Sequence, residues 1–361
     1  MIKKGRLCNM EKFNLDLYMQ PFWEGNSVVN ETFLPYKIDE DMEMFLEVPL
    51  LYRVDEIEYI SNYELTQTYK EGEDYFLKDG KIIIPCDSKI SPMLKSIMNP
   101  TAIPNDGLNA KCATGGYLLY TEGDLIVKKQ CVISYKHTDK WSGFKPNGQI
   151  NKLPKIKRSL KQGGSISLVV YGDSITVGCN SSGFMNMSPF MPTWPDMVVQ
   201  ALKCKYGAEI TCTNCAVGGT TSSWGLDNFD NVFKNINADL FFVNFGMNDG
   251  VNVSVDTYIR NIKGIIEKIL CKNKYAEVVL VASTFPNPLA MGIECYKDRY
   301  PYLFKLADEF NDSVAVAPLT PIHEYILTKK RYFDMTANNI NHPNDMMCRI
   351  YAQTVFDILH I

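Results

Sequence analysis

Histidine is scarce in this chain, and several features that mark particular protein classes are missing. Four histidines occur in 361 residues, so few side chains are offered for a histidine-based metal site, and we expect no metal or other cofactor. No apolar run approaches membrane-spanning length, and the first residues lack the apolar core of a secretion signal. We therefore expect a cytoplasmic protein without a membrane partner.

A surplus of positive charge is also missing, and the cysteines follow no framework. The net charge is -4, whereas nucleic-acid binding needs a concentrated basic face, so no nucleic-acid partner is expected. The 11 cysteines are scattered, unlike those of a small disulfide scaffold. Cys212 and Cys215 form an unpartnered C-x-x-C motif, for which ordinary packing is favoured over metal or redox chemistry. Oligomeric state stays open, with an oligomer among the options.

Short strand signals dominate residues 1–150. A hairpin is predicted over 74–84, where Asp79-Gly80 suits a type I′ turn because both central residues need positive φ. A second hairpin is predicted from 117–120 through a turn into 125–127. Because no amphipathic helix interrupts these strands, we predict an all-β sandwich domain over 1–150. The Lys-rich stretch 151–164 is interpreted as a solvated linker.

Strands and helices alternate over residues 165–361, which predicts an α/β domain with a mostly parallel, doubly wound sheet. The predicted strands are 166–171, 209–214, 240–245 and 278–283, and the predicted helices are 195–206, 255–271 and 345–360. Polar loops follow three of these strands and precede the last helix. Because ligands collect at the carboxyl ends of parallel strands, we expect a site there.

These loops carry the groups needed for acyl transfer. They are Gly172-Asp173-Ser174, residues 214–221, residues 246–249 and residues 338–345. A serine hydroxyl becomes a nucleophile when a base removes its proton, and histidine suits that task near neutral pH. His342 is the best candidate base and His323 the reserve, because His137 lies in the β region and His360 lies next to the C-terminus.

The four blocks, in this order, resemble the SGNH (GDSL-type) hydrolases, and the match covers roughly residues 165–361. The resemblance implies a flavodoxin-like three-layer fold with Ser174 as nucleophile and His342 as base. It implies an oxyanion hole made by the N–H groups of Ser174 and Gly219 and the side chain of Asn248, with Gly218 as the adjacent alternative to Gly219. Asp173 is implied to brace loops rather than to take part in catalysis.

One position departs from that family pattern. The family usually has aspartate three residues before the histidine, whereas this chain has Asn339. Losing such a carboxylate can cost about 10⁴ in rate, since the imidazole tautomer is no longer held. Our hypothesis is that Asn339, through its side chain or main chain, orients His342. The alternative is a displaced carboxylate such as Asp334.

The substrate is predicted from domain order. A β-sandwich ahead of the hydrolase domain resembles the arrangement of bacterial carbohydrate esterases that carry a jelly-roll domain, which implies an acetylated oligosaccharide as substrate. Another small ester remains open, as for a short-chain lysophospholipase or thioesterase, and so does a catalytically decayed sugar-binding protein. The Met- and aromatic-rich loop 184–194 either lines the substrate pocket or packs in the core.

Overall fold

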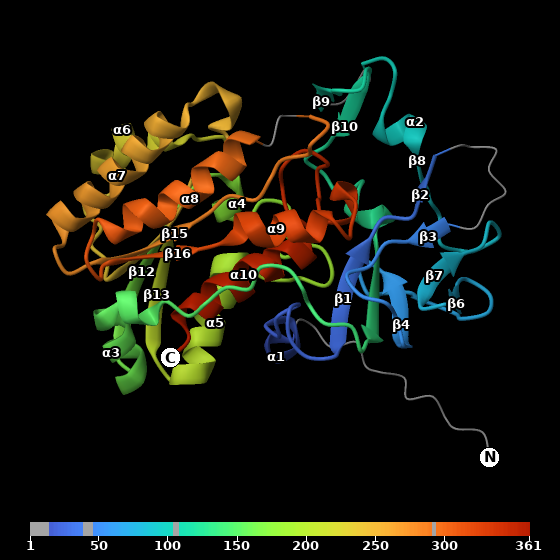
Figure 1. The fold of residues 1–361 in the computed structure, drawn as a ribbon, viewed down its shortest axis with the longest axis horizontal. Helices are drawn as coiled ribbons and strands as arrows, with labels where there is room; N and C mark the ends of the chain where they lie inside the picture. Colours follow the sequence, from blue (N-terminus) through green and yellow to red (C-terminus); the bar gives the residue numbers. More distant parts are fainter. Residues whose placement is uncertain (1–13, 39–45, 104–107, 291–293) are drawn as a thin grey trace.

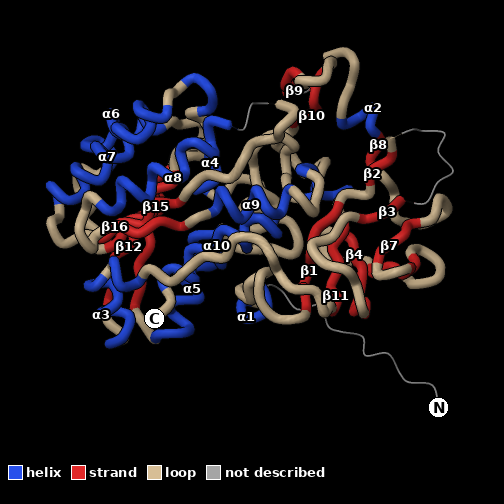
Figure 2. Tube along the Cα trace, viewed as in Figure 1, coloured by secondary structure: helices blue, strands red, loops and turns tan. Residues whose placement is uncertain are grey.

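The computed structural model describes residues 14–38, 46–103, 108–290 and 294–361. Figure 1 shows two regions side by side, one built on a sheet flanked by helices and one built from short strands. Figure 2 shows the same division as two separate groups of strands. None of the helices in these described ranges has the length and apolar character that crossing a bilayer requires.

A five-stranded parallel sheet forms the centre of the second region. Its strand order is β13-β12-β14-β15-β16, so the first strand lies between the second and third, as in flavodoxin-like folds. The strands are β12 (Ser165–Gly172), β13 (Glu209–Asn214), β14 (Leu240–Asn244), β15 (Glu277–Val281) and β16 (Val314–Ala317). Gly172 pairs with Asn244, so the ends of β12 and β14 lie next to each other.

Helices cover both faces of this sheet. The helices are α5 (Trp194–Tyr206), α6 (Ser222–Val232), α7 (Val255–Lys272), α8 (Glu294–Asp308), α9 (Leu319–Leu327) and α10 (Asp345–Leu359). Successive strand side chains point to opposite faces. Accordingly, Val170 belongs to the core that contains residues of α5, α9 and α10, whereas Val169 belongs to the core that contains residues of α6, α7 and α8. The predicted three-layer α/β fold is confirmed.

The N-terminal region is rich in small sheets, as predicted for the part of the chain that precedes the hydrolase fold. A four-stranded sheet has the order β1-β11-β4-β5, a three-stranded sheet has the order β3-β7-β6, and β10-β9 and β2-β8 form two-stranded sheets. The strands are β1 (Ser27–Phe33), β2 (Tyr36–Lys37), β3 (Leu46–Val48), β4 (Glu56–Asn62), β5 (Thr68–Tyr69), β6 (Phe76–Lys78), β7 (Lys81–Ile84), β8 (Met93–Leu94), β9 (Leu108–Lys111), β10 (Tyr117–Tyr120) and β11 (Cys131–Lys136), with short helices α1 (Leu15–Tyr18) and α2 (Lys95–Met98).

The first predicted hairpin is confirmed and the second is wrong. Strands β6 and β7 pair across a two-residue turn in which Asp79 and Gly80 have φ values of 53° and 76°. Strand β10, however, pairs with the preceding β9 instead of a following strand. Val127 lies in a short 3-10 helix, because its fully buried side chain packs against Tyr63 rather than joining a ladder.

The predicted linker is a helix. Residues Pro154–Gln162 form α3, with proline in its first turn, where a missing N–H costs nothing. Ile156 and Leu160 lie four residues apart on one face and are buried, while Gly163, at φ 61°, ends the helix. The Lys-rich pattern reflected the solvated face of this amphipathic helix, so the expectation of a solvated linker is corrected to a helix with one buried face.

The two regions share a buried core. Phe33 and Ile133 of the N-terminal sheet belong to the same apolar cluster as Ile350 and Tyr351 of α10. Polar contacts add to this junction: Glu31 of β1 and Lys330, which follows α9, form a fully buried ion pair at 2.7 Å. Burial of such a pair is favourable only when both partners are present.

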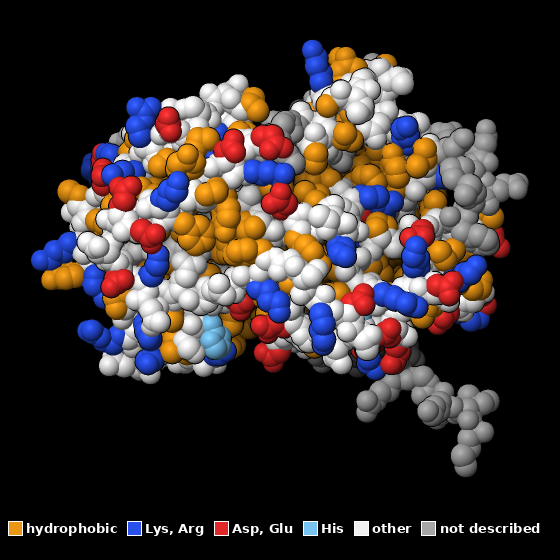
Figure 3. Space-filling view, in the orientation of Figure 1, with side chains coloured by type: hydrophobic (Ala, Val, Ile, Leu, Met, Phe, Trp, Pro, Cys, Tyr) orange, Lys and Arg blue, Asp and Glu red, His pale blue; other side chains and the backbone are white. Residues whose placement is uncertain are grey.

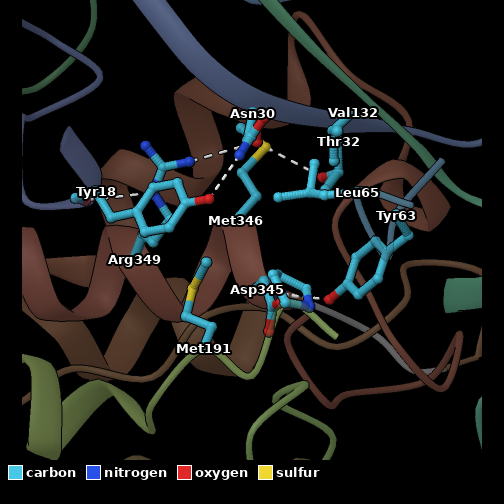
Figure 4. A pocket seen from close by; sticks show the side chains of 11 residues that line it. Tyr18, Asn30, Thr32, Tyr63, Leu65, Val132, Met191, Asp345, Met346 and Arg349 are labelled. Carbon is cyan, nitrogen blue, oxygen red and sulfur yellow. Dashed lines mark hydrogen bonds between the residues drawn. The ribbon is translucent and has the colours of Figure 1, made fainter. Parts of the chain in front are cut away.

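Helix α10 also meets the N-terminal region through polar side chains. Arg349 donates to the Val29 carbonyl at 2.6 Å, and the backbone N–H of Asp345 donates to the Tyr63 hydroxyl at 2.9 Å. Figure 4 shows Arg349 beside Tyr18 and Asn30 and, in another part of the view, Asp345 beside Tyr63. These residues line a small cavity of about 10 Å³. The junction therefore has a specific geometry as well as apolar area.

Candidate active site

Ser174 lies on the turn between β12 and the short helix α4 (Ser174–Val177). Glycine is required at position 172, two residues before Ser174, because a Cβ on Gly172 would lie 2.2 Å from the Asn244 carbonyl oxygen. Asp173 caps α4 by accepting a hydrogen bond from the N–H of Ile175 at 3.0 Å. The turn thus fixes Ser174 at the carboxyl edge of the sheet.

His342 meets Ser174 from the loop before α10. Its Nε2 lies 2.8 Å from the Ser174 Oγ, and both residues are largely buried, with 7% and 6% of their surfaces exposed. The contact joins two residues from opposite ends of the hydrolase region. It has the geometry of a nucleophile and a general base.

Asn338 organises the loop that carries His342. Its side-chain Oδ1 accepts hydrogen bonds from three successive backbone N–H groups, those of Ile340, Asn341 and His342, at 2.9–3.0 Å. Its Nδ2 donates to the Asn341 side chain at 3.0 Å. A buried amide that is satisfied in this way holds the loop in one conformation.

The Nδ1 of His342, which is the ring nitrogen that does not contact Ser174, has two acceptors nearby. The Asn180 Oδ1 lies 2.5 Å from Nδ1, and the Glu122 Oε2 lies 3.2 Å from the same atom. A carboxamide oxygen can only accept, so Nδ1 carries the proton in this arrangement. The unprotonated Nε2 of the neutral ring then faces the Ser174 hydroxyl and can take its proton.

The hypothesis for Asn339 is wrong in this structure. The Asn339 Nδ2 donates to the Leu119 carbonyl at 3.0 Å, and its two oxygens accept from Asn287. Asn339, which has a positive φ of 66°, is among the residues that line a cavity of about 510 Å³, and this lining includes neither Ser174 nor His342.

The alternative, Asp334, is also excluded as the partner of His342. Its carboxylate accepts hydrogen bonds from the Leu34 N–H at 2.8 Å and from Arg331 at 2.9 Å and 3.0 Å. These contacts tie the N-terminal region to the segment after α9. Asp334 therefore serves the junction between the two regions.

Two loops expected to supply oxyanion donors flank the nucleophile. A Cβ placed on Gly218 would lie 3.7 Å from the Ser174 Cβ, and the neighbouring Gly219 has a φ of 76°. Asn248 uses its Nδ2 to donate to the Thr220 carbonyl at 3.0 Å. That amide group has a second proton, so the bond orients Asn248 and leaves one donor for a ligand.

Side chains from neighbouring elements hold the Asn248 loop. Arg299 of α8 donates to the Gly246 carbonyl at 3.2 Å and to the Gly250 carbonyl at 2.6 Å. Asp249 accepts from the Ser222 N–H at 3.0 Å, which links this loop to the start of α6. The second and third blocks are thereby fixed relative to one another.

Asp173 is buried beneath these loops. Burial raises the pKa of Asp173 to about 7, although hydrogen bonds from the backbone N–H groups of Ile175 and Met247 oppose that rise. Its contacts are to the backbone of the first and third blocks. These contacts support the bracing role that the family resemblance implied.

The remaining histidines are used elsewhere. His323 accepts a hydrogen bond from the Phe285 N–H at 3.0 Å, and burial lowers the pKa of its ring to about 3. His137 stacks on Tyr52 in the N-terminal region. Neither therefore competes with His342 as the base beside Ser174.

The Met- and aromatic-rich loop is partly buried in the core. Met191 and Trp194 are buried in the core, and the Trp194 indole donates to the Ile175 carbonyl behind the nucleophile helix. Phe184 and Phe190 instead remain about half exposed. The core interpretation thus holds for the end of the loop, and the two phenylalanines remain available at the surface.

Sequence reasoning missed three residues around His342: Asn180, Glu122 and Asn338. Asn180 follows the nucleophile helix closely, so a search for amide side chains near Ser174 could have found it. Asn338 was part of the histidine block but had no role assigned. Glu122 lies in the N-terminal region, where no sequence motif points to His342.

The hydrolase region was compared with known proteins. Residues 170–349 match the model of the GDSL-like Lipase/Acylhydrolase family. This part of the chain belongs to the GDSL-like lipase/acylhydrolase family. The prediction of a carboxylic ester hydrolase is confirmed at the level of this family.

One arylesterase and two carbohydrate esterases of known structure are similar to parts of the chain. An arylesterase from Vibrio mimicus is 25% identical over 176 residues, which cover 46% of this chain and 76% of the arylesterase. The structure of a two-domain esterase active on acetylated mannans, co-crystallised with mannopentaose, matches with a TM-score of 0.46 and 21% identity over 59% of this chain and 54% of that chain. An acetylxylan esterase from Geobacillus stearothermophilus matches with a TM-score of 0.46 and 16% identity over 56% of this chain and 97% of that chain. This chain thus spans about half the length of the mannan esterase.

Proposed function

We propose that this protein is a serine esterase that removes O-acyl groups, and specifically O-acetyl groups, from carbohydrate. Ser174 is the nucleophile and His342 the general base. The observation that carries this proposal is the 2.8 Å contact between the Ser174 Oγ and the His342 Nε2 at the carboxyl edge of the sheet. The substrate is an acetylated oligosaccharide or another small ester.

Acylation begins when the Ser174 Oγ attacks the ester carbonyl while its proton passes to the His342 Nε2. The carbonyl oxygen becomes an anion, which the N–H groups of Ser174 and Gly219 and the free proton of the Asn248 amide stabilise. Removing one such donor typically costs about 2.7–4 kcal/mol of transition-state stabilisation. The bond to the alcohol then breaks, and the alcohol oxygen leaves with the proton from Nε2.

Deacylation repeats these steps with water. His342 takes a proton from the attacking water, a second oxyanion forms in the same place, and Ser174 leaves with the proton as the acid is released. The hydrogen bond from Nδ1 to the Asn180 Oδ1 keeps the ring in the required tautomer throughout.

The surroundings of Ser174 favour a substrate with a short acyl group attached to a polar alcohol such as a sugar. Gly218, Gly219 and Val217 are exposed beside the nucleophile, with 42% of the Val217 surface accessible. The polar side chains of Glu122 and Asn248 lie in the adjoining loops. An open and polar rim of this kind suits a sugar better than an extended alkyl chain.

The chain's charge distribution fits an uncharged or weakly charged substrate. On the face shown in Figure 3, basic and acidic side chains are interspersed and no continuous patch of one sign is visible among the described residues. A nucleic acid would require a concentrated basic face. A small neutral ester makes no such demand.

The decisive test compares wild type with Ser174→Ala. We expect acetate release from acetylated xylo- and manno-oligosaccharides by wild type and a loss of at least ~10⁴-fold in kcat for the variant. The melting temperature of the variant serves as its folding control. Equal turnover by both proteins would refute the role of Ser174.

A chain-length series tests the acyl preference. Wild type should turn over p-nitrophenyl acetate with a burst, as an acyl-enzyme requires, and lose activity as the acyl chain lengthens. Rates that rise beyond acetate would instead indicate a lysophospholipase or thioesterase. Glycan binding without turnover would indicate a sugar-binding protein.

A further inference from the structure

Glu122 reaches the active-site histidine from the N-terminal region. It lies in the turn that follows β10, and its Oε2 lies 3.2 Å from the His342 Nδ1. This region precedes the matched family segment, which starts at residue 170. The contact therefore brings a carboxylate from outside the hydrolase region to the atom that a triad aspartate would contact.

We infer that Glu122 is a positioning residue for the acyl transfer proposed above, on which this inference rests: its carboxylate stabilises the protonated ring of His342. The N-terminal region then supplies the negative charge that the hydrolase region lacks at Asn339. His342 becomes positively charged each time it holds the serine or water proton. A carboxylate beside Nδ1 favours that state and so lowers the barrier.

Two hydrogen bonds hold the carboxylate and its turn in place. The Tyr120 hydroxyl donates to the Glu122 Oε1 at 2.6 Å, which leaves Oε2 directed at the ring. The Asn180 Nδ2 donates to the Glu122 backbone carbonyl at 3.1 Å. The same Asn180 side chain thus binds His342 through its oxygen and the Glu122 turn through its nitrogen.

Glu122 is ionised at neutral pH. Its hydrogen bonds with His342 and Tyr120, of which the His342 contact is the larger influence, lower the pKa of Glu122 to about 2 although partial burial opposes this. The carboxylate is thus available as a constant charge from mildly acidic to alkaline pH.

Asn180 and Glu122 both contact the Nδ1 of His342 but affect the ring in different ways. Asn180 lies closer to Nδ1 and is neutral, so it fixes the tautomer without stabilising the charged ring to the same extent. Glu122 carries charge, but 45% of its side chain is exposed, so solvent weakens its attraction. We therefore expect a smaller effect than the ~10⁴-fold loss seen when a buried triad aspartate is replaced.

Other ionisable groups surround this pair. Tyr120 contacts Glu122 and has a pKa raised above its usual value by burial, and burial also raises the pKa of the nearby Cys179. Asp173, whose pKa is raised to about 7 by burial, lies beneath Ser174. Because Asp173 is unchanged in a Glu122 variant, the difference between two pH profiles isolates the contribution of Glu122.

The test measures kcat and KM of wild type and Glu122→Gln on p-nitrophenyl acetate as a function of pH. We expect kcat to fall by about 10-fold to 100-fold at neutral pH with KM nearly unchanged. We also expect the acid limb of kcat/KM to move to lower pH by up to about one unit, since the charged ring loses its partner. In wild type, high salt should move that limb in the same direction, and Glu122→Gln should respond less.

Asp124→Asn is the matched control. Asp124 lies two residues further along the same turn and pairs with the exposed Lys128, away from the ring. Its replacement should leave kcat and the acid limb as in wild type. Glu122→Asp, which keeps the charge on a shorter side chain, should recover part of the activity and part of the limb position.

The outcomes separate the inference from the function on which it rests. If Ser174→Ala is inactive while Glu122→Gln retains the wild-type kcat and acid limb, the positioning role of Glu122 is refuted and the esterase function stands. A fall in kcat without a change in the limb or in its salt response would show a structural role only, which also refutes the inference. Turnover that survives in Ser174→Ala would refute the function itself.

Discussion

The two regions of this molecule are built on different scales, although they share one core. The parallel sheet has strands of four to eight residues and is covered by helices of up to 18 residues. The N-terminal region contains strands of two to seven residues in four small sheets. The first kind of element can be recognised from its own residues, whereas the second depends on the partners that surround it.

A change in composition is therefore not a boundary in packing. Phe33 and Ile133 are buried in the same apolar cluster as Ile350, although helix α3 separates them from Ile350 along the chain. The buried Glu31–Lys330 pair crosses the same junction. We expect the two regions to unfold together, and the following three changes test how far that unity extends.

The largest expected effect on stability comes from Lys330→Met. It leaves Glu31 buried with hydrogen bonds from the Leu51 N–H and the Tyr135 hydroxyl but without a cation. Breaking one side of a buried pair costs about 3–5 kcal/mol of unfolding free energy. Urea unfolding followed by tryptophan fluorescence and by esterase activity should show one transition at a lower midpoint.

Lys152→Met provides the control for that experiment. Lys152 pairs with Asp308 at 2.7 Å, but 70% of the Asp308 side chain is exposed, so solvent screens the pair. Its midpoint should stay close to wild type. If activity in Lys330→Met survived beyond the fluorescence transition, the two regions would be shown to unfold separately.

A smaller loss of stability, with a large loss of activity, is expected for Gly172→Ala. The added Cβ would lie 2.2 Å from the Asn244 carbonyl oxygen and 2.3 Å from the Thr176 Oγ1, so the nucleophile turn must shift. Overpacking of this kind costs about 1–3 kcal/mol. A displacement near 1 Å can lower kcat by about 10²-fold, which p-nitrophenyl acetate turnover would measure.

Gly80 in the N-terminal hairpin is the matched control position for Gly172. Gly80→Ala meets only the flexible Arg53 side chain, and its positive φ of 76° makes the change costly by about 1 kcal/mol. We expect kcat to be unchanged in that variant. A loss of activity equal to that of Gly172→Ala would mean that the hairpin controls the active site.

The third comparison concerns a buried carboxyl in each region. Glu31 is paired with Lys330, whereas the hydrogen bonds to Asp173 come from uncharged backbone N–H groups. Because the pKa of Asp173 is raised to about 7, the folded state holds a proton that the unfolded chain releases near pH 4. Stability should therefore decline from about pH 4 to 7, by up to about 1.4 kcal/mol per pH unit, and level off above.

Asp173→Asn should remove this part of the decline. Asparagine can still cap α4 by accepting from the Ile175 N–H. Urea unfolding of both proteins between pH 4.5 and 8 gives the comparison. Asp345 and Asp357, whose pKa values are both raised to about 6, affect the stability of wild type and variant alike, so their contribution cancels. Parallel curves for the two proteins would contradict the proposed buried, protonated Asp173.

The sequence was sufficient to predict the parts of the site that occupy strand ends. Ser174 follows a continuous apolar strand bounded by glycines, and His342 precedes a long helix that is rich in apolar residues. The structure brings these two side chains together. The core helices α6 and α8 and strand β16 were not predicted, since Gly225 and Pro301 interrupt the helices and β16 is only four residues long.

The surroundings of His342 could not be predicted for a different reason. Asn180 reaches the ring from a left-handed position with φ 64°, and Asn339 turns away from a position with φ 66°. Both asparagines adopt nearly the same left-handed φ, so neither residue type nor local backbone conformation shows which one contacts His342; this depends on where each lies in the fold. Glu122 depends on the packing of one region against another, which no local pattern contains.

The shared core also has a practical meaning for dividing the chain. A fragment that starts at β12 would expose the side of α10 that Phe33 and Ile133 cover, and such a surface favours aggregation. Two separately produced halves would carry complementary apolar faces and the two members of the Glu31–Lys330 pair. They could thus recombine on mixing, as the parts of a split reporter enzyme do.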